Sequence, residues 1–217
     1  MGGSINLFSE ICGLIDSYGG RDTLMEALCC SAKLVAGLQA TRNPDLAQRC
    51  ATVSSKISGA RATLRLIDDL PVLQYSLEYG LGAGEPDRFT AVLGVMSNMV
   101  DLLFYPIETV CWLAEHKVLD LRRKDAWNYA NSIFCVLSAH LNLVRTLRRF
   151  SLHRDALNRQ DLVSVARISL DLLQAVGSLP RGNLWGGKLS TFQMGAIGTL
   201  SAVLGIYQIL AARRLNK

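Results

Sequence analysis

Two carboxylates in a long apolar stretch are the residues of this sequence best suited to acid–base chemistry. Asp101 and Glu108 lie seven residues apart, so a helix through them places both near one face. Such a pair can act as general acid and general base, but no nucleophile, histidine or metal-ligand pattern converges on it. The sequence therefore favours a polar stripe. Because carboxylates facing lipid are costly, we expect residues 89–114 to form a helix that is buried in protein or lies at the interface.

The thiols and imidazoles form no recognisable site either. The six cysteines include no Cys-x-x-Cys pair, and the three histidines stand at no metal-ligand spacing from them (Cys12, Cys29, Cys30, Cys50, Cys111, Cys135; His116, His140, His153). The glycine-rich run from Gly80 to Gly84 lacks the Lys-Ser/Thr ending of a phosphate-binding loop. We expect no catalytic residue, no cofactor and no metal, in a non-enzymatic, cytosol-facing protein whose thiols are reduced and packed.

The composition places most of the chain in contact with water or lipid headgroups. Of the 217 residues, 50% are hydrophobic and 19% are charged, close to the globular average, so one domain or one domain with a membrane anchor fits the length. The net charge of +5 comes from scattered basic residues, without the aromatic platforms of a single-strand nucleic-acid binder. We expect no nucleic-acid partner, because attraction to anionic headgroups explains the charge as well.

The clearest membrane signal is the segment 189–212, which has 24 residues and no charged side chain, with Arg213 and Arg214 directly after it. A helix of this length reaches about 36 Å, and the hydrocarbon core of a bilayer is about 30 Å thick. Small residues recur along the segment at the spacing of close helix packing in membranes: Gly195, Gly198, Ser201, Ala202 and Gly205. We interpret residues 189–217 as a C-terminal transmembrane helix with a short basic tail. The alternative is a buried helix of a soluble core.

A second candidate span covers 126–144, where no Lys, Arg, Asp or Glu occurs between two basic clusters. Its asparagines and a histidine weaken the signal, so one span or two are equally open. Within the region 121–188, the residues after this span form a basic helical connection. A hairpin made of the two spans would place the connection 145–188 on the side opposite the N-terminal helices, whereas the positive-inside tendency would hold it in the cytosol.

The region 1–120 is predicted to contain amphipathic helices that face the cytosol. The first helix is expected from Ser4 to about Ser17, and Gly19 with Gly20 is expected to end it. The apolar face that we expect to insert into the membrane is formed by Leu7, Phe8, Ile11, Leu14 and Ile15. The alternative is that this face packs against another helix.

Further helices follow in the same region. One is expected over 21–38, and another begins at Pro44. From Leu46 to Ile67 apolar residues alternate at spacings of four and three, which predicts a seam packed against an antiparallel neighbour. Pro71 is expected to kink this helix or to begin the next one.

Four blocks of the sequence carry a family resemblance that covers nearly the whole chain. They are YGGRDTLMEALCCSAKLV from Tyr18, RATLRLIDDLPVLQYSLEYGLGAGEPD from Arg61, LFYPIETVCWLAEHKVL from Leu103 and LPRGNLWGGKLSTFQMGAIGTLSAVLGIYQ from Leu179. In this order they resemble the peroxisomal membrane protein 11 (peroxin-11) family, most closely its gamma-type branch. No block is a catalytic signature, and Pro71 departs from the pattern.

The helical pattern and the resemblance together imply an all-α, membrane-associated helical bundle with amphipathic helices and one or two transmembrane helices. The resemblance implies an integral protein of the peroxisomal membrane that promotes curvature, elongation and fission. Its partners would be peroxisomal lipids, itself and other peroxin-11 proteins, a tail-anchored fission adaptor and a dynamin-related GTPase. The alternative function is a peroxisomal channel or metabolite carrier with a polar path lined by Asp101, Glu108, Asn131 and His140.

Overall fold

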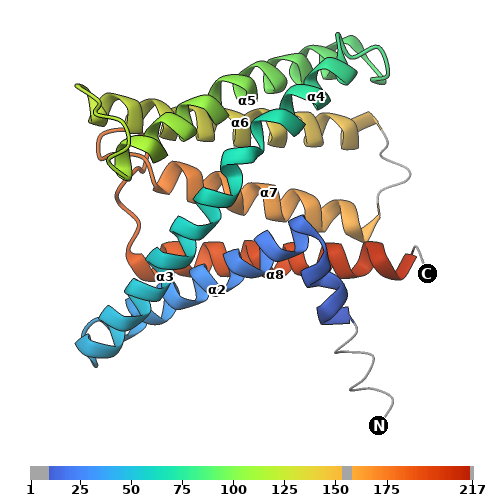
Figure 1. Ribbon diagram of the computed structural model, residues 1–217. Coiled ribbons are helices and arrows are strands. Elements are labelled where there is room, and N and C mark those ends of the chain that lie inside the picture. Colours follow the sequence, from blue (N-terminus) through green and yellow to red (C-terminus); the bar gives the residue numbers. More distant parts are fainter. Residues whose placement is uncertain (1–9, 153–157, 216–217) are drawn as a thin grey trace. The chain divides into compact units, whose positions relative to one another are not determined.

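The computed structural model describes residues 10–152 and 158–215, and every regular element in these ranges is a helix, as predicted (Figure 1). Residues 10–16 are helical. The longer elements follow in the order α2 (Tyr18–Gln39), α3 (Pro44–Leu64), the 3₁₀ turn η1 (Arg65–Ile67), α4 (Asp69–Tyr79), α5 (Arg88–Glu115), α6 (Lys124–Leu152), α7 (Arg159–Gly177) and α8 (Thr191–Leu215).

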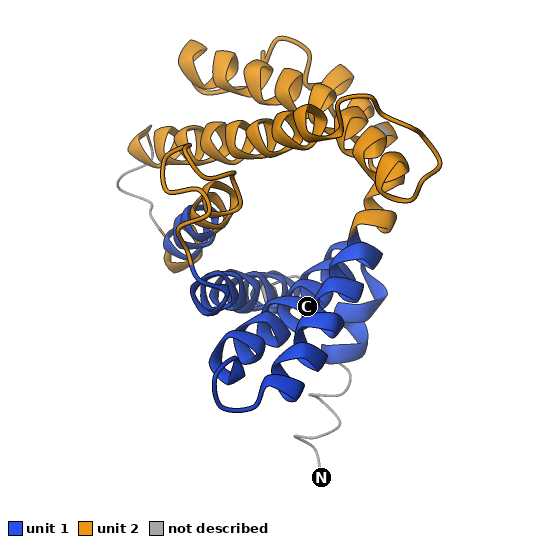
Figure 2. Ribbon diagram, turned by 90° about the vertical axis from the view of Figure 1, so that its left-hand side faces the viewer, with its two compact units in different colours: residues 1–61, 162–170, 190–217 blue, residues 62–161, 171–189 orange. Residues whose placement is uncertain are grey.

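The chain divides into two compact units, coloured separately in Figure 2. Unit 1 comprises residues 1–61, 162–170 and 190–217, and its centre is the pair formed by α2 and α8. Unit 2 comprises residues 62–161 and 171–189, and its centre is the pair formed by α5 and α6, with α4 against α5. Each unit joins segments that are distant in sequence, so the three-part division 1–120, 121–188 and 189–217 stays a prediction about the membrane.

The start of α2 differs from the expectation for the two glycines. The helix through residues 10–16 ends at a bend at Ser17, whose hydroxyl accepts a hydrogen bond from the Gly20 amide at 3.2 Å and thereby caps α2. Gly19 and Gly20 therefore lie in the first turn of α2 rather than ending the preceding helix. A Cβ on Gly20 would collide with the carbonyl oxygen of Leu14, so glycine permits the sharp reversal between the two helices.

The break between α3 and α4 has a local cause. Pro71 lies in the first turn of α4, where its missing amide hydrogen is not needed. Its ring would clash with the carbonyl of Ile67 in a continuous helix, and the chain forms η1 over the preceding residues instead. The proline thus begins α4, one of the two outcomes expected from the sequence.

Two described helices are long and apolar enough to cross a bilayer: Arg88–Glu115 and Thr191–Arg214. The second confirms the apolar C-terminal helix predicted from the sequence. For residues 89–114, the first rules out burial of most of the helix in protein, because only 28% of its apolar window is buried, and the interfacial position stays a prediction. The helix α6, which contains the predicted span 126–144, does not meet the same criterion because its asparagines and histidine lower its hydropathy.

Candidate functional site

The small residues of α8 face the interior of unit 1. Gly195, Gly198, Ser201, Ala202 and Gly205 are all buried. The backbone of Leu34 on α2 lies so close to Gly195 that no Cβ fits there, and the backbone of Phe192 excludes one at Gly37 in the same way. The two helix backbones therefore touch, as small residues permit.

The small-residue face of α8 is occupied by packing inside the chain, mainly against α2. Gly205 extends this packing into the second half of α8, where a Cβ would meet Thr23 of α2 and Arg167 of α7. The opposite face of α8 is exposed and apolar, with Leu200 and Val203 more than half accessible. Association between copies through α8 would therefore have to use this outer face.

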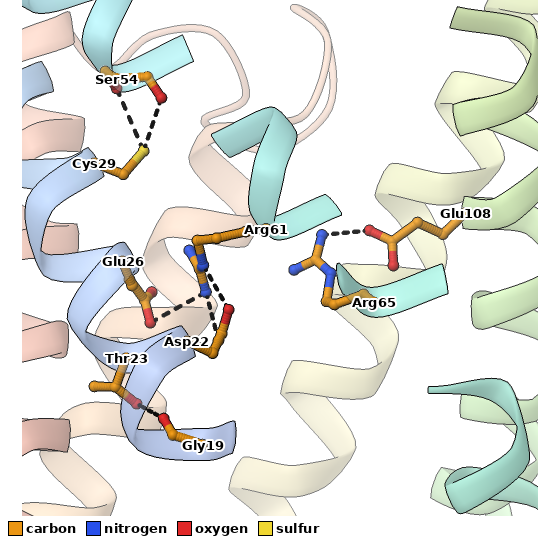
Figure 3. A network of polar contacts seen from close by, with 9 residues as sticks. All are labelled: Gly19, Asp22, Thr23, Glu26, Cys29, Ser54, Arg61, Arg65 and Glu108. Carbon is orange, nitrogen blue, oxygen red and sulfur yellow. Dashed lines mark hydrogen bonds and ion pairs between the residues drawn. The ribbon is translucent and has the colours of Figure 1, made fainter. Parts of the chain in front are cut away.

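Arg61 of α3 joins two acidic side chains of α2 (Figure 3). Its Nε and Nη2 atoms donate to the two carboxylate oxygens of Asp22 at 2.8 and 2.9 Å, and Nη2 lies 3.5 Å from Glu26. Further along α2, the buried thiol of Cys29 lies 3.3 Å from the carbonyl oxygen of Ser54. These contacts fix α3 on α2 through polar groups, because the paired guanidinium and carboxylates stabilise each other away from water.

The carboxylates that could have formed an acid–base pair have separate partners in unit 2. The Asp101 carboxylate accepts a hydrogen bond from the Ser138 hydroxyl of α6 at 2.6 Å. Glu108 accepts one from Arg65 of η1 at 2.5 Å, as Figure 3 shows. A partnered carboxylate is far less costly in an apolar setting than an unpaired one, so these contacts make two acids in α5 compatible with a membrane span.

A carboxylate in the loop after α4 collects three donors. Arg145 and Arg149 of α6 each donate to Oε1 of Glu85 at 2.6 Å, and the Tyr79 hydroxyl donates to it at 3.1 Å. The Arg145 guanidinium also lies 5.0 Å from the centre of the Tyr79 ring, a cation–π distance. Glu85 is thus the centre of a contact that joins α4, the loop and α6.

Asp87 extends this contact to the start of α5. One of its oxygens accepts from the Thr90 amide at 2.9 Å and caps α5, while the other accepts from Arg148 at 2.7 Å. We call Tyr79, Glu85, Asp87, Arg145, Arg148 and Arg149 the loop clamp. Sequence reasoning missed it, although the spacing of the three arginines on one helical face and the two acids in one loop were available signals.

The loop clamp is expected to weaken in acid. Burial alone would raise the pKa of Glu85, but the hydrogen bonds from Arg145, Arg149 and Tyr79 outweigh it and hold this pKa below its ordinary value of 4.5. The contribution of Glu85 to stability is therefore complete above pH 4.5 and is lost as the pH falls through the lowered value. We expect Glu85→Gln to cost about 1 kcal/mol at pH 7 and much less at pH 3, measured by thermal unfolding in detergent.

Glu78→Gln supplies the control for this prediction, because Glu78 is an exposed carboxylate of α4 that accepts a hydrogen bond from the Gln74 amide of the same helix. Its effect on the free energy of unfolding should stay within about 0.5 kcal/mol at both pH values. A Glu85→Gln protein with the same pH dependence as the unchanged chain would contradict the role of the clamp.

The predicted membrane-inserting face is only partly described. Leu7 and Phe8 lie outside the described residues. Ile11 and Ile15 are exposed at 44% and 41%, whereas Leu14 is 4% exposed. Leu14 therefore packs within unit 1. Among the described residues of the predicted face, only Ile11 and Ile15 point outward.

The apolar seam of α3 is not buried by a neighbouring helix, contrary to the sequence expectation. Leu46, Val53, Leu64 and Ile67 are exposed, and α3 instead meets α2 through Ser54 and Arg61. The exposed row continues with Leu70 and Leu77 of α4 and with Leu81 just after that helix, which are 73%, 74% and 86% accessible. Their helical spacing in the sequence could have revealed this outward stripe.

The described residues contain no group of three His, Cys, Asp or Glu side chains placed to hold a metal ion. All six cysteines are free thiols. A concavity of about 630 Å³ opens at the start of α6, where Leu121, Arg122, Arg123 and Trp127 line it.

The exposed apolar helices and their partnered polar groups define an all-α integral membrane protein. A family model described as Peroxisomal biogenesis factor 11 (PEX11) matches residues 8–162. The chain is 31% identical to Peroxisomal membrane protein 11C of Homo sapiens, over 94% of this chain and 95% of that protein. It is also 31% identical to the Mus musculus protein of the same name, over 96% of each. No solved structure matches it.

The chain belongs to the PEX11 family. The matches confirm the resemblance seen in the sequence, including the gamma-type branch. The names of the relatives and the two apolar helices place the chain in the peroxisomal membrane as an integral protein.

Proposed function

We propose that this chain is a non-enzymatic membrane-shaping protein that promotes curvature, elongation and fission of peroxisomes. Family membership supports the peroxisomal membrane role. The observation that carries the shaping step is the outward apolar stripe along η1, α4 and the turn directly after α4, which we define as Ile67, Leu70, Leu73, Leu77 and Leu81. The exposed fraction of each of these side chains is 44% or more.

The opposite side of α4 is held in place while this stripe points outward. A Cβ on Gly94 of α5 would collide with the Tyr79 ring, so the tyrosine lies directly on the α5 backbone. The loop clamp then ties the end of α4 to α6. An amphipathic helix fixed in this way can present its leucines to a membrane surface without separating from unit 2.

The stripe would act as a wedge in one leaflet. Apolar faces of interfacial helices lie about 5–10 Å deep, at the boundary between headgroups and acyl chains. Removing each leucine from water is favourable by about 1.5 kcal/mol or more. The inserted helix expands the leaflet that it enters, which favours positive curvature. Ile11 and Ile15 offer a second, smaller apolar surface in unit 1.

The α5–α6 pair suggests how unit 2 enters the bilayer. Asp101 meets Ser138, and Asp87 at the start of α5 meets Arg148 near the end of α6, so the two helices are antiparallel. If α5 crosses the membrane, the uncharged segment 126–144 lies beside it at the same depth. Such a hairpin returns the basic connection 145–188 to the side from which α5 entered, as the positive-inside tendency favours for this connection, and places the turn with Arg122 and Arg123 on the opposite side.

The proposal includes the partners that the resemblance implies. These are further copies of the chain and other PEX11 proteins, a tail-anchored fission adaptor and a dynamin-related GTPase. The outward faces of α8 and α4 are among the exposed apolar surfaces that lipid or protein could cover in the described residues. Fission itself would then be performed by the GTPase on a membrane that this chain has curved.

A reconstitution experiment tests the wedge. We expect the full chain in liposomes to produce tubules, and the double change Leu70→Glu with Leu77→Glu to reduce their number at least about fivefold, because two charges oppose insertion of the stripe. Electron microscopy scores the tubules at equal protein content.

Ser55→Glu with Ser58→Glu adds the same charge at exposed polar positions of α3 and should leave tubulation unchanged. Ile11→Glu with Ile15→Glu measures the share of the N-terminal surface. Full tubulation by the α4 variant would remove the stripe from the mechanism, and tubulation lost only in the N-terminal variant would move the wedge to residues 10–16.

The second candidate function is a channel or metabolite carrier. The observation in its favour is that Asn98 Nδ2 on α5 and Asn131 Oδ1 on α6 are buried without a hydrogen-bond partner in the described residues. Of the other predicted lining residues, Glu108 is bound by Arg65 and His140 is exposed. Conductance across planar bilayers that is lost on Asp101→Asn, together with unchanged membrane shape, would favour this function over shaping.

A further inference from the structure

The turn between α5 and α6 combines an open concavity with basic and aromatic side chains. Its lining consists of Leu121, Arg122, Arg123 and Trp127 around about 630 Å³. The ion pairs and side-chain hydrogen bonds that hold the described residues together do not include either of the two guanidinium groups. Two adjacent guanidinium groups in an open concavity are suited to a phosphate group, because each can donate two hydrogen bonds to its oxygens.

The position of this turn next to α5 favours a lipid headgroup as the source of the phosphate group. It follows directly after Glu115, the last residue of the apolar helix α5, and therefore lies at a membrane surface if α5 crosses the bilayer. Val118 and Leu119 in the same turn are 69% and 40% exposed. Exposed apolar side chains next to cations fit the boundary between acyl chains and headgroups.

The start of α6 adds to the attraction for an anion. The helix begins at Lys124, so the positive end of its dipole lies next to Arg122 and Arg123. Asp120 and Asp125 are acidic neighbours in sequence, but neither lines the concavity. The surface offered to a ligand is thus cationic and aromatic, with one apolar side chain.

We propose that this turn is a binding site for the phosphate-bearing headgroup of an anionic phospholipid. Arg122 and Arg123 bind the phosphate, and Trp127 packs against the glycerol and upper acyl region as interfacial tryptophans do. The site anchors the α5–α6 hairpin in one leaflet and makes the position of unit 2 sensitive to lipid composition. It rests on the membrane-shaping proposal only in that α5 crosses the bilayer.

Lipid binding to the detergent-solubilised full chain tests the site. Native mass spectrometry counts bound phosphatidylinositol phosphate and, separately, bound phosphatidylcholine. We expect Arg122→Gln with Arg123→Gln to weaken binding of the anionic lipid about tenfold or more and to leave phosphatidylcholine unchanged. Arg122→Lys with Arg123→Lys should recover part of the affinity, because the charge remains without the planar fork.

Arg49→Gln with Lys56→Gln removes the same charge from exposed positions of α3 and should change binding less than twofold. Unchanged anionic-lipid binding in the Arg122/Arg123 glutamine variant, or an equal loss in the α3 control, would overturn the proposal. Displacement of the lipid by inorganic phosphate at equal concentration would also overturn it, because the site would then hold a soluble anion. The readout involves no change of membrane shape, so its failure is distinct from failure of the wedge.

Discussion

Gly195→Leu is expected to separate α2 from α8 and to give the largest loss of stability in unit 1. The leucine side chain would enter space occupied by the Leu34 backbone, which cannot move aside as a flexible side chain can. We expect a cost of about 3 kcal/mol or more and a fall of about 10 °C in the unfolding temperature, since about 1 kcal/mol corresponds to 2–4 °C in a chain of this size. Thermal unfolding of the purified chain in detergent measures it.

Val203→Leu is the matched control for this change. Val203 lies on the exposed side of α8, so the added methylene meets no protein atom that must move. The unfolding temperature should change by less than about 2 °C. A Gly195→Leu protein as stable as this control would show that α2 and α8 are not in contact through their backbones.

The second large effect is expected for Arg61→Met. Methionine keeps much of the volume of the side chain but leaves Asp22 and Glu26 next to each other without the cation that holds them. We expect a loss of about 2 kcal/mol, below the full cost of a buried unpaired charge because Arg61 keeps 17% of its side-chain surface accessible. Chemical unfolding in detergent, followed by circular dichroism, measures the change.

Two further variants assign this loss to the ion pairs. Arg61→Lys keeps the charge but not the two parallel hydrogen bonds to Asp22, so an intermediate stability is expected. Adding Asp22→Asn and Glu26→Gln to Arg61→Met should recover much of the loss, because neutral amides no longer repel each other. Equal stability of Arg61→Met and the unchanged chain would contradict a structural role for this network.

The sequence predicts the helical elements because their signals are local. Pro44 begins α3, and all but the first two residues of the charge-free segment 189–212 lie in α8. The small residues of α8 were recognisable for the same reason, since their spacing on one face is a property of that helix alone. What the spacing could not provide is the identity of the neighbour, which is α2.

The features that the sequence did not predict depend on contacts between distant segments. Carboxylates that face lipid are costly, and the two carboxylates of α5 avoid this cost through their contacts with Ser138 and Arg65. The loop clamp joins residues about 60 positions apart, and no local pattern selects such partners. The heptad spacing of α3 predicted a buried seam, but spacing specifies a face and not whether protein or lipid covers it.

The most direct test of the shaping function is fluorescence microscopy of the tagged full chain beside a peroxisomal marker, with organelle length and number scored on overexpression. The proposal predicts overlap with the marker and elongated or more numerous peroxisomes, with a much weaker effect for Leu70→Glu with Leu77→Glu. Peroxisomes that contain the protein and keep their size and number at the same expression level would contradict it.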